Sequence, residues 1–127
     1  MLRITAGIFG GRRLYGPEER HATRPTQAKL RQALYNSIQA WVPEARVLDL
    51  FAGAGTLGFE ALSRGAKEVV FFESAKPLCK LIERNAKELG VESQVRIFSE
   101  KVEKSGKTLE GIVETGGTFD LVLADPP

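Results

Sequence analysis

A glycine-rich segment that follows an apolar stretch constrains the fold of this chain more than any other feature. Residues 47–58 read VLDLFAGAGTLG and set Gly53, Gly55 and Gly58 at the passage from an expected strand into an expected helix. Glycine has no side chain beyond hydrogen, so the backbone can turn tightly there and approach a bound ligand closely. The segment therefore predicts a strand, loop and helix unit with a ligand at the loop.

Strands and helices are expected to alternate from residue 46 onward. The pattern predicts strands at 46–51, 68–73, 95–98 and 119–124, and helices at 56–64, 76–89 and, weakly, 100–114. Such alternation is typical of βαβ units, so we predict an α/β fold with a doubly wound, mostly parallel, Rossmann-like sheet. Four strands are few for this architecture and the last one runs directly into Asp125, so we expect a sheet that is truncated at its C-terminal side.

The N-terminal part of the chain has a different pattern. Residues 1–6 and 12–15 can pair as a β-hairpin across a glycine-containing turn, and a helix is expected to open at Pro25-Thr26, with Thr26 as its N-cap. Four apolar side chains recur at helical spacing and are predicted to form the buried stripe of this helix: Leu30, Leu34, Ile38 and Trp41. We therefore divide the chain into an N-terminal extension, residues 1–45, and a ligand-binding core, residues 46–127.

Basic residues are concentrated in that N-terminal part. Residues 1–46 hold eight Lys or Arg and three Asp or Glu, whereas residues 47–127 hold ten basic and thirteen acidic residues. A basic segment on a nearly neutral body suits a polyanion such as RNA, because Lys and Arg displace condensed counterions from phosphates. On charge alone, a solvated basic surface without a nucleic-acid partner explains the same pattern.

Two acidic residues near the glycine segment distinguish between ligands. Glu73 ends the second expected strand, 20 residues after Gly53, where a carboxylate can accept hydrogen bonds from both hydroxyls of a ribose. Asp49 lies near the end of the first expected strand, where a carboxylate is a poor neighbour for a pyrophosphate. It is a good neighbour for the cationic amino group of S-adenosylmethionine. The glycine spacing alone also fits a dinucleotide, so an NAD-binding oxidoreductase domain is the alternative, and a helix cap is the structural alternative for Asp49.

The last residues, Asp125-Pro126-Pro127, follow an apolar strand. Two prolines make a rigid, extended turn without backbone donors. A carboxylate and free carbonyls held there can accept both hydrogens of an exocyclic amino group and aim its lone pair at a methyl donor. Catalysis would then consist mainly of positioning.

Together these features resemble the class I methyltransferases that carry a D/N-P-P-Y/F motif and methylate amino nitrogens. Three N-terminal segments narrow the resemblance to the bacterial 16S ribosomal RNA guanine-N(2)-methyltransferase family: residues 3–14, Arg24-Pro25-Thr26 and residues 31–36. The resemblance covers essentially the whole chain. It implies S-adenosylmethionine as the cofactor, and the 2-amino group of a guanine in small-subunit ribosomal RNA as the acceptor.

The resemblance also implies roles for individual residues. The cofactor-binding residues are expected to be Asp49, Phe51, Gly53, Gly55, Thr56, Glu73, Ser74 and Glu100. The catalytic residues are expected to be Asp125 and Pro126, and the RNA-binding residues Arg3, Arg12, Arg13, Arg24, Thr26 and Arg31.

Three positions depart from the family pattern. No aromatic residue follows Pro127, Ala75 stands where the family usually has an acidic residue, and Glu100 stands near the expected adenine contact. We therefore expect this chain to bind the cofactor weakly and not to turn over. A non-catalytic RNA-binding fragment is the third functional alternative.

Other partners are not indicated by the sequence. It holds no apolar run of the roughly 20 residues that span a bilayer, and its start lacks the apolar centre of a signal peptide. Cys79 is the single cysteine and His21 the single histidine, so neither a disulfide nor a metal site is expected. We expect a cytoplasmic monomer without a metal or membrane partner.

Overall fold

Four parallel strands form the central sheet of the chain. The computed structural model describes residues 2–17 and 25–126. The strands lie in the order β5-β4-β3-β6 and comprise β3 (Arg46–Leu50), β4 (Glu68–Phe72), β5 (Val95–Phe98) and β6 (Leu121–Ala124). All three neighbouring pairs are parallel. The α/β fold and the parallel Rossmann-like sheet predicted from the sequence are therefore confirmed.

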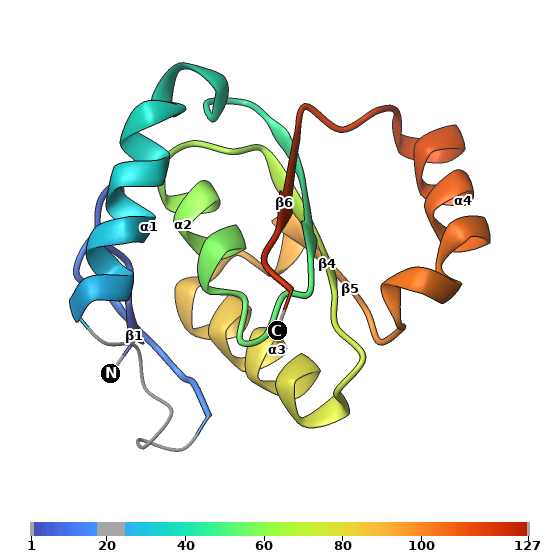
Figure 1. Cartoon of the computed structure of the whole chain (residues 1–127), viewed down its shortest axis with the longest axis horizontal. Helices are drawn as coiled ribbons and strands as arrows, with labels where there is room; N and C mark the ends of the chain where they lie inside the picture. Colours follow the sequence, from blue (N-terminus) through green and yellow to red (C-terminus); the bar gives the residue numbers. More distant parts are fainter. Residues whose placement is uncertain (1, 18–24, 127) are drawn as a thin grey trace.

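Helices cover both faces of this sheet (Figure 1). The helices are α1 (Pro25–Ser37), α2 (Thr56–Ser63), α3 (Lys76–Leu89) and α4 (Gly106–Gly116), with short 3-10 turns η2 (Gln39–Trp41), η3 (Glu92–Gln94) and η4 (Val102–Lys104). Val47 of β3 and Phe71 of β4 pack in the core under α1, α2 and α3, whereas Leu48 and Phe72 pack in a second core with Ile112 of α4. The strands are apolar on both faces because side chains alternate along them and each face is covered.

The strand order places a switch point at the centre of the sheet. The chain builds β3, β4 and β5 outward in one direction and then returns to pair β6 with the other side of β3. Asp49 lies opposite Leu123, and Leu50 opposite Ala124. The two strands therefore end side by side, and this edge is where open α/β sheets bind their ligands.

The N-terminal hairpin consists of β1 (Leu2–Arg3) and β2 (Arg13–Leu14), which pair antiparallel. The predicted hairpin is present, although its strands are shorter than expected. Leu2, Ile4 and Leu14 are buried in the same core as Val47 of β3. The hairpin thus packs directly on the rest of the molecule, and the division of the chain at residue 45 stays a prediction.

The buried face of α1 differs from the prediction. Three side chains expected to be buried are exposed by 66%, 42% and 72%: Leu30, Leu34 and Trp41. Of the expected stripe, only Ile38 packs against the core, and among the side chains of α1 that the structure describes, residues 27–37, the buried ones are Arg31 and Tyr35. The Tyr35 hydroxyl donates to the Leu57 carbonyl, and the Arg31 guanidinium pairs with Glu60. The helix therefore packs on the core through hydrogen-bonded and ion-paired side chains. The spacing of apolar residues in the sequence does not predict contacts of this kind.

Glu60 of α2 is the centre of a buried polar network that holds the N-terminal segment. Its carboxylate accepts hydrogen bonds from the Thr5 backbone and hydroxyl, at 2.9 and 2.8 Å, and from the Ala6 backbone at 3.2 Å. It also pairs with the guanidinium groups of Arg31 at 3.2 Å and Arg64 at 3.0 Å. Because Glu60 is fully buried, these five contacts replace the water that the charge has lost.

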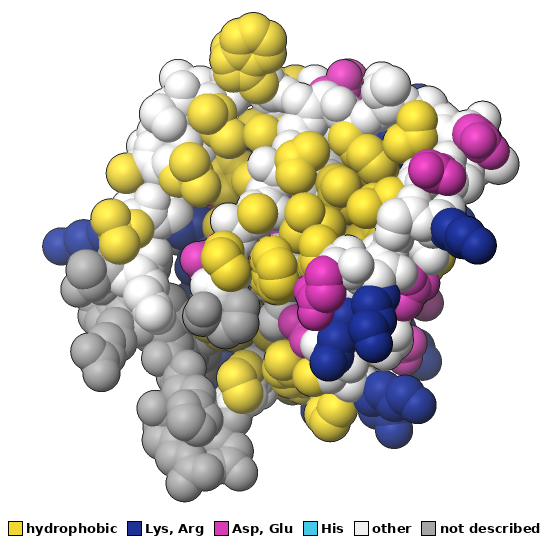
Figure 2. Space-filling view, turned by 45° about the vertical axis from the view of Figure 1, so that its right-hand side comes forward, with side chains coloured by type: hydrophobic (Ala, Val, Ile, Leu, Met, Phe, Trp, Pro, Cys, Tyr) yellow, Lys and Arg dark blue, Asp and Glu magenta, His cyan; other side chains and the backbone are white. Residues whose placement is uncertain are grey.

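Part of the molecular surface is apolar. Val122 of β6 and Val113 of α4 are exposed by 54% and 39%. In Figure 2, hydrophobic side chains gather over the middle of the face turned toward the viewer.

In the part of the chain that the structure describes, no helix is both long and apolar enough to cross a membrane.

Candidate cofactor and active site

A pocket of about 370 Å³ opens at the carboxyl edge of the sheet. It is lined by Phe51, Gly53, Phe72, Glu73, Ser74, Leu78, Glu100, Lys101, Val102, Glu103 and Asp125. These residues come from the ends of β3, β4, β5 and β6, and from α3. The pocket therefore lies at the switch point, where the fold class leads us to look for a ligand.

Six of these lining residues were expected at the site from the sequence: Phe51, Gly53, Glu73, Ser74, Glu100 and Asp125. Of the other residues expected there, Asp49, Gly55, Thr56 and Pro126 do not line the pocket. Asp49 is only 1% exposed and lies beneath it. Gly55 precedes the first turn of α2, which Thr56 opens.

Several lining residues were not expected from the sequence. Leu78 of α3 and Val102 of η4 give the pocket apolar walls beside the charged Lys101 and Glu103. Leu78 lies two residues into α3 and Val102 four residues past β5, so both occupy loops or helix starts at the strand ends. Their place just after a strand or at the start of a helix is the only feature of the sequence from which they could have been predicted as lining residues.

The glycine-rich loop has the backbone geometry that the sequence predicts. Gly53 and Gly55 have φ angles of 61° and 86°, in the left-handed region that favours glycine. A β-carbon on Gly55 would lie 2.7 Å from the Phe59 ring. Phe51 shares this conformation, with φ at 56°, although it is a bulky residue. Strained residues of this kind cost about 1–3 kcal/mol and cluster at binding sites.

Glu73 holds the glycine loop in place. One carboxylate oxygen accepts a hydrogen bond from the Gly53 amide at 2.9 Å, and the other accepts one from the Ala75 amide at 2.8 Å. A carboxylate has about four acceptor positions. Glu73 can therefore fix the loop and still accept hydrogen bonds from hydroxyl groups of a ligand.

Asp49 is a buried acid whose carboxyl has a raised pKa. The pKa of its carboxyl is raised to about 7, mainly by burial and further by the nearby charges of Asp125 and Glu73, against the opposing hydrogen bond from Gly58. The Gly58 amide donates to Asp49 at 3.1 Å, so Asp49 caps the first turn of α2. The helix cap considered as the structural alternative for Asp49 is therefore present, and the same carboxylate lies close to Glu73 and Asp125, two of the four acids that line the pocket.

The residues expected to face RNA are distributed unevenly. Arg3 and Arg12 are exposed, and they donate to the carbonyls of Gly11 and Glu88. Arg13 is also exposed and has a partner of its own. Arg31 is buried in the Glu60 network and also donates to the Arg3 carbonyl at 2.6 Å, so it does not reach the surface. Arg24 lies outside the described residues, as does the side chain of Thr26.

Titratable side chains do not form a metal site in residues 2–17 and 25–126. No group of three or more His, Cys, Asp or Glu side chains in these ranges could hold a metal ion. Cys79 is buried, and its thiol contacts the Glu73 carbonyl at 3.2 Å.

Comparison with known proteins places the chain in a family. The sequence pattern of a family described as conserved hypothetical protein 95 matches residues 2–127. The chain belongs to this family. This member of the conserved hypothetical protein 95 family is 34% identical, over 126 residues, to ribosomal RNA small subunit methyltransferase D of Haemophilus influenzae. The alignment covers 99% of the chain and 63% of that relative, so the chain spans less than two thirds of the relative's length.

Solved structures agree with this assignment. A hypothetical protein from Thermus thermophilus is 29% identical, with a TM-score of 0.80 over all of this chain and 70% of its own. A SAM-dependent methyltransferase from Agrobacterium tumefaciens is 25% identical, with a TM-score of 0.61 over 83% of this chain and 33% of its own. The resemblance to the small-subunit ribosomal RNA methyltransferases inferred from the sequence is confirmed for this conserved hypothetical protein 95 family member.

Proposed function

We propose that this protein transfers a methyl group from S-adenosylmethionine to the 2-amino group of a guanine in 16S ribosomal RNA. One observation carries the proposal. Four carboxylates, those of Glu73, Glu100, Glu103 and Asp125, line a single pocket at the switch point of a methyltransferase-like sheet, and the charges of two of them, Glu73 and Asp125, raise the pKa of the buried Asp49. Similarity to a ribosomal RNA small subunit methyltransferase supports RNA as the substrate class.

The charge of the pocket favours S-adenosylmethionine over a dinucleotide. Asp49 stands beneath the glycine loop, and its proton affinity is raised partly by the two other acids. An added cation relieves this repulsion, whereas the pyrophosphate of NAD would add two negative charges to it. Glu73 would bind the ribose hydroxyls, with Leu78 and Val102 as apolar walls beside the adenine. The glycine spacing fits a dinucleotide, but the negative charge of the pocket disfavours its pyrophosphate.

Asp125 and Pro126 would hold the acceptor amine. Asp125 lines the pocket at the end of β6, a strand fixed in register against β3. The Asp125 carboxylate and the Pro126 carbonyl are both acceptors, which suits the two hydrogens of an exocyclic amino group. Their role would be to orient the nitrogen toward the methyl group.

The RNA would approach from the N-terminal side, where Arg3, Arg12 and Arg13 are exposed. We leave Arg31 out of this surface because it is buried and ion-paired. Arg24 and Thr26 remain candidates from the sequence alone. A monomeric, cytoplasmic protein is part of the same proposal, and a non-catalytic RNA-binding protein is the alternative that a failure to bind the cofactor would favour.

Calorimetric titration with S-adenosylhomocysteine and with NAD tests the cofactor. We expect the first ligand to bind and the second not to bind. Glu73→Ala should weaken binding of the first by roughly 1.5–3 kcal/mol, the range for a hydrogen bond to a charged group. Glu83→Ala, which removes an exposed acid from α3 outside the pocket, is the matched control. Binding of NAD alone, or equal affinities for the Glu73 and Glu83 variants, would contradict the proposed site.

The raised pKa of Asp49 predicts a pH dependence of both stability and binding. The folded state holds this proton more tightly than the unfolded chain, whose carboxyl has a pKa of 3.8. The stability that it contributes is present in acid and is lost as the pH rises from about 4 toward 7. A cationic ligand favours the charged carboxylate, so its affinity should rise about three- to tenfold between pH 6 and pH 8.

Asp49→Asn keeps an acceptor for the Gly58 amide but cannot ionise. Calorimetry at several pH values should therefore show a flatter affinity profile for this variant, and a lower affinity than the original protein at pH 8. The same slope in both proteins would assign the pH dependence to another group.

A further inference from the structure

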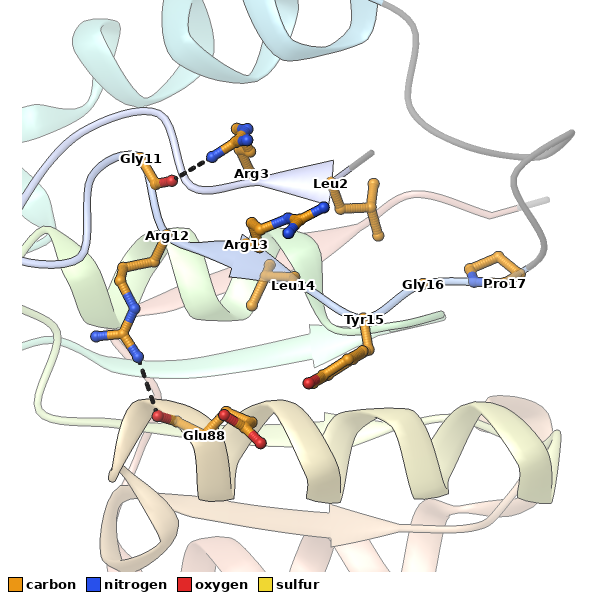
Figure 3. A pocket seen from close by; sticks show the side chains of 10 residues that line it. All are labelled: Leu2, Arg3, Gly11, Arg12, Arg13, Leu14, Tyr15, Gly16, Pro17 and Glu88. Carbon is orange, nitrogen blue, oxygen red and sulfur yellow. Dashed lines mark hydrogen bonds between the residues drawn. The ribbon is translucent and has the colours of Figure 1, made fainter.

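A second concave surface lies between the N-terminal hairpin and α3, away from the cofactor pocket. We name it the hairpin groove. It has a volume of about 840 Å³ and is lined by Leu2, Arg3, Gly11, Arg12, Arg13, Leu14, Tyr15, Gly16, Pro17 and Glu88. In Figure 3, the Tyr15 ring reaches from the hairpin toward α3, and Arg12 reaches the same helix at Glu88. The groove is therefore open along one side of α3, with arginines on its hairpin wall.

An arginine–tyrosine pair stands at the edge of this groove. The guanidinium carbon of Arg84, on α3, lies 3.6 Å from the centre of the Tyr15 ring. Both side chains are exposed, and Tyr15 is 38% accessible. A guanidinium stacked on an aromatic ring presents a flat, positively charged surface with free donors at its edge.

The backbone of Tyr15 is held rigidly by a buried side chain. The amide oxygen of Asn85 accepts from the Tyr15 amide at 2.6 Å, and its nitrogen donates to the Tyr15 carbonyl at 2.9 Å. Asn85 is 1% exposed, and its nitrogen also donates to the Ala54 carbonyl of the glycine loop at 3.2 Å. The Tyr15 end of the groove therefore borders the backbone of the proposed cofactor loop.

The groove is positively charged. Arg3 and Arg12 donate to backbone carbonyls only, and Arg84 forms no ion pair with any carboxylate among the described residues. Among the residues that the structure describes, Glu88 is the one acid that lines the groove, and it contacts Arg12 through its backbone oxygen. The positive charge is thus available to an anionic partner.

We propose that the hairpin groove binds a single-stranded segment of RNA, with phosphates at Arg12 and Arg84 and a base against the Tyr15–Arg84 pair. Unpaired RNA is recognised by stacking of its bases on aromatic rings and guanidinium planes, next to a basic groove for the backbone. An acidic protein segment would use the charges but not the stacked pair. The inference rests on the proposed function, and it extends the RNA-binding surface from the hairpin onto α3.

The test is a titration of the full-length protein with a fluorescent single-stranded RNA of about ten nucleotides, a length within the site sizes of single-strand binders. Arg84→Ala should weaken binding about fivefold or more and lower the slope of log affinity against log salt by about 0.7. Arg96→Ala is the matched control, because Arg96 is also exposed and also lies over an aromatic ring, that of Phe98, but outside the groove. We expect it to change affinity less than about twofold.

Tyr15→Leu separates stacking from charge. It should weaken single-stranded RNA binding by a similar factor and leave the salt slope unchanged, with little effect on binding of a duplex of the same sequence. Thermal unfolding and S-adenosylhomocysteine binding, measured on the same samples, verify that the variants are folded.

Each outcome separates this inference from the proposed function. Tight RNA binding that Arg84→Ala and Arg96→Ala affect equally would overturn the groove but leave the methyltransferase proposal intact. Competition by polyglutamate as strong as that by RNA, without an effect of Tyr15→Leu, would assign the groove to an acidic protein. Failure of the unaltered protein to bind RNA while it binds S-adenosylhomocysteine would overturn the RNA part of both proposals.

Discussion

Asp125→Ala is expected to lower methyl transfer by about 10²–10³-fold, the range for loss of one preorganised hydrogen-bonding group in an active site. Asp125 lines the pocket directly after β6, whose pairing with β3 fixes its position. Alanine has no side-chain acceptor for the hydrogens of the acceptor amine, so the amine loses its orientation. Binding of S-adenosylhomocysteine should change little, because the substitution leaves Glu73 and the glycine loop intact.

The measurement is incorporation of tritiated methyl groups into 16S ribosomal RNA and into small subunits by a protein extended past Pro127 to the length of the curated relative, since the chain by itself is expected not to turn over. Asp120→Ala is the control, since Asp120 directly precedes the same strand at its other end, where it accepts a hydrogen bond from the Arg46 amide at 2.8 Å. If the Asp125 variant kept its rate within a few fold of the Asp120 variant, Asp125 would not be the residue that orients the amine.

Glu60→Ala is expected to lower the free energy of unfolding by about 3–5 kcal/mol, the usual cost of removing one partner from a buried ion pair. The substitution leaves the buried guanidinium of Arg31 without its carboxylate, and it removes the acceptor of the Thr5 and Ala6 amides. Urea unfolding followed by circular dichroism measures the effect. Glu68→Ala is the control, because among the described residues Glu68 pairs with one guanidinium group only, that of Arg46, and its side chain is 31% exposed, so its loss should cost less than that of the fully buried Glu60.

The Glu60 network also predicts a response to acid. Burial by itself would raise the pKa of the Glu60 carboxyl, but hydrogen bonds from Thr5, Arg64 and Arg31 outweigh it and hold the pKa below the ordinary 4.5. The stability from this group is therefore present above pH 4.5 and is lost as the pH falls below the folded-state pKa. The unaltered protein should lose more stability than Glu60→Ala in that range. Equal acid sensitivity of the two proteins would remove Glu60 as its source.

The sheet and the ligand edge could be predicted because their signals are local. Apart from Asp49, the buried residues in the middle of β3 and β4 are apolar, and glycines or prolines mark the ends of α2 and α3. A carboxylate at the end of one strand and a glycine loop after its neighbour must meet at one edge of a parallel sheet. The hydrogen bond between the Gly53 amide and Glu73 is an example of two residues whose proximity follows from this rule.

The contacts of α1 could not be predicted, because they depend on partners that are distant in sequence. The sequence around Arg31 is that of a surface cation, and only Glu60, 29 residues away, supplies the buried carboxylate that draws it inside. The exposed Trp41 shows the converse, since its helical spacing predicts contact with a core that does not extend to it. The stacking of Arg84 on Tyr15 has the same origin, a contact that exists only after the hairpin has packed on α3.

The anchors of the hairpin also set an order of folding. Thr5 is bonded to Glu60, 55 residues further along the chain, and Tyr15 to Asn85, 70 residues further along. Contacts of such sequence separation form late, because the long intervening loop must first be closed. During synthesis on the ribosome, the hairpin emerges well before the helices that receive it. The buried side chains of Leu2, Ile4 and Leu14 remain open to solvent until α2 and α3 have been made, so a segment that is synthesised early is among the last to reach its native contacts.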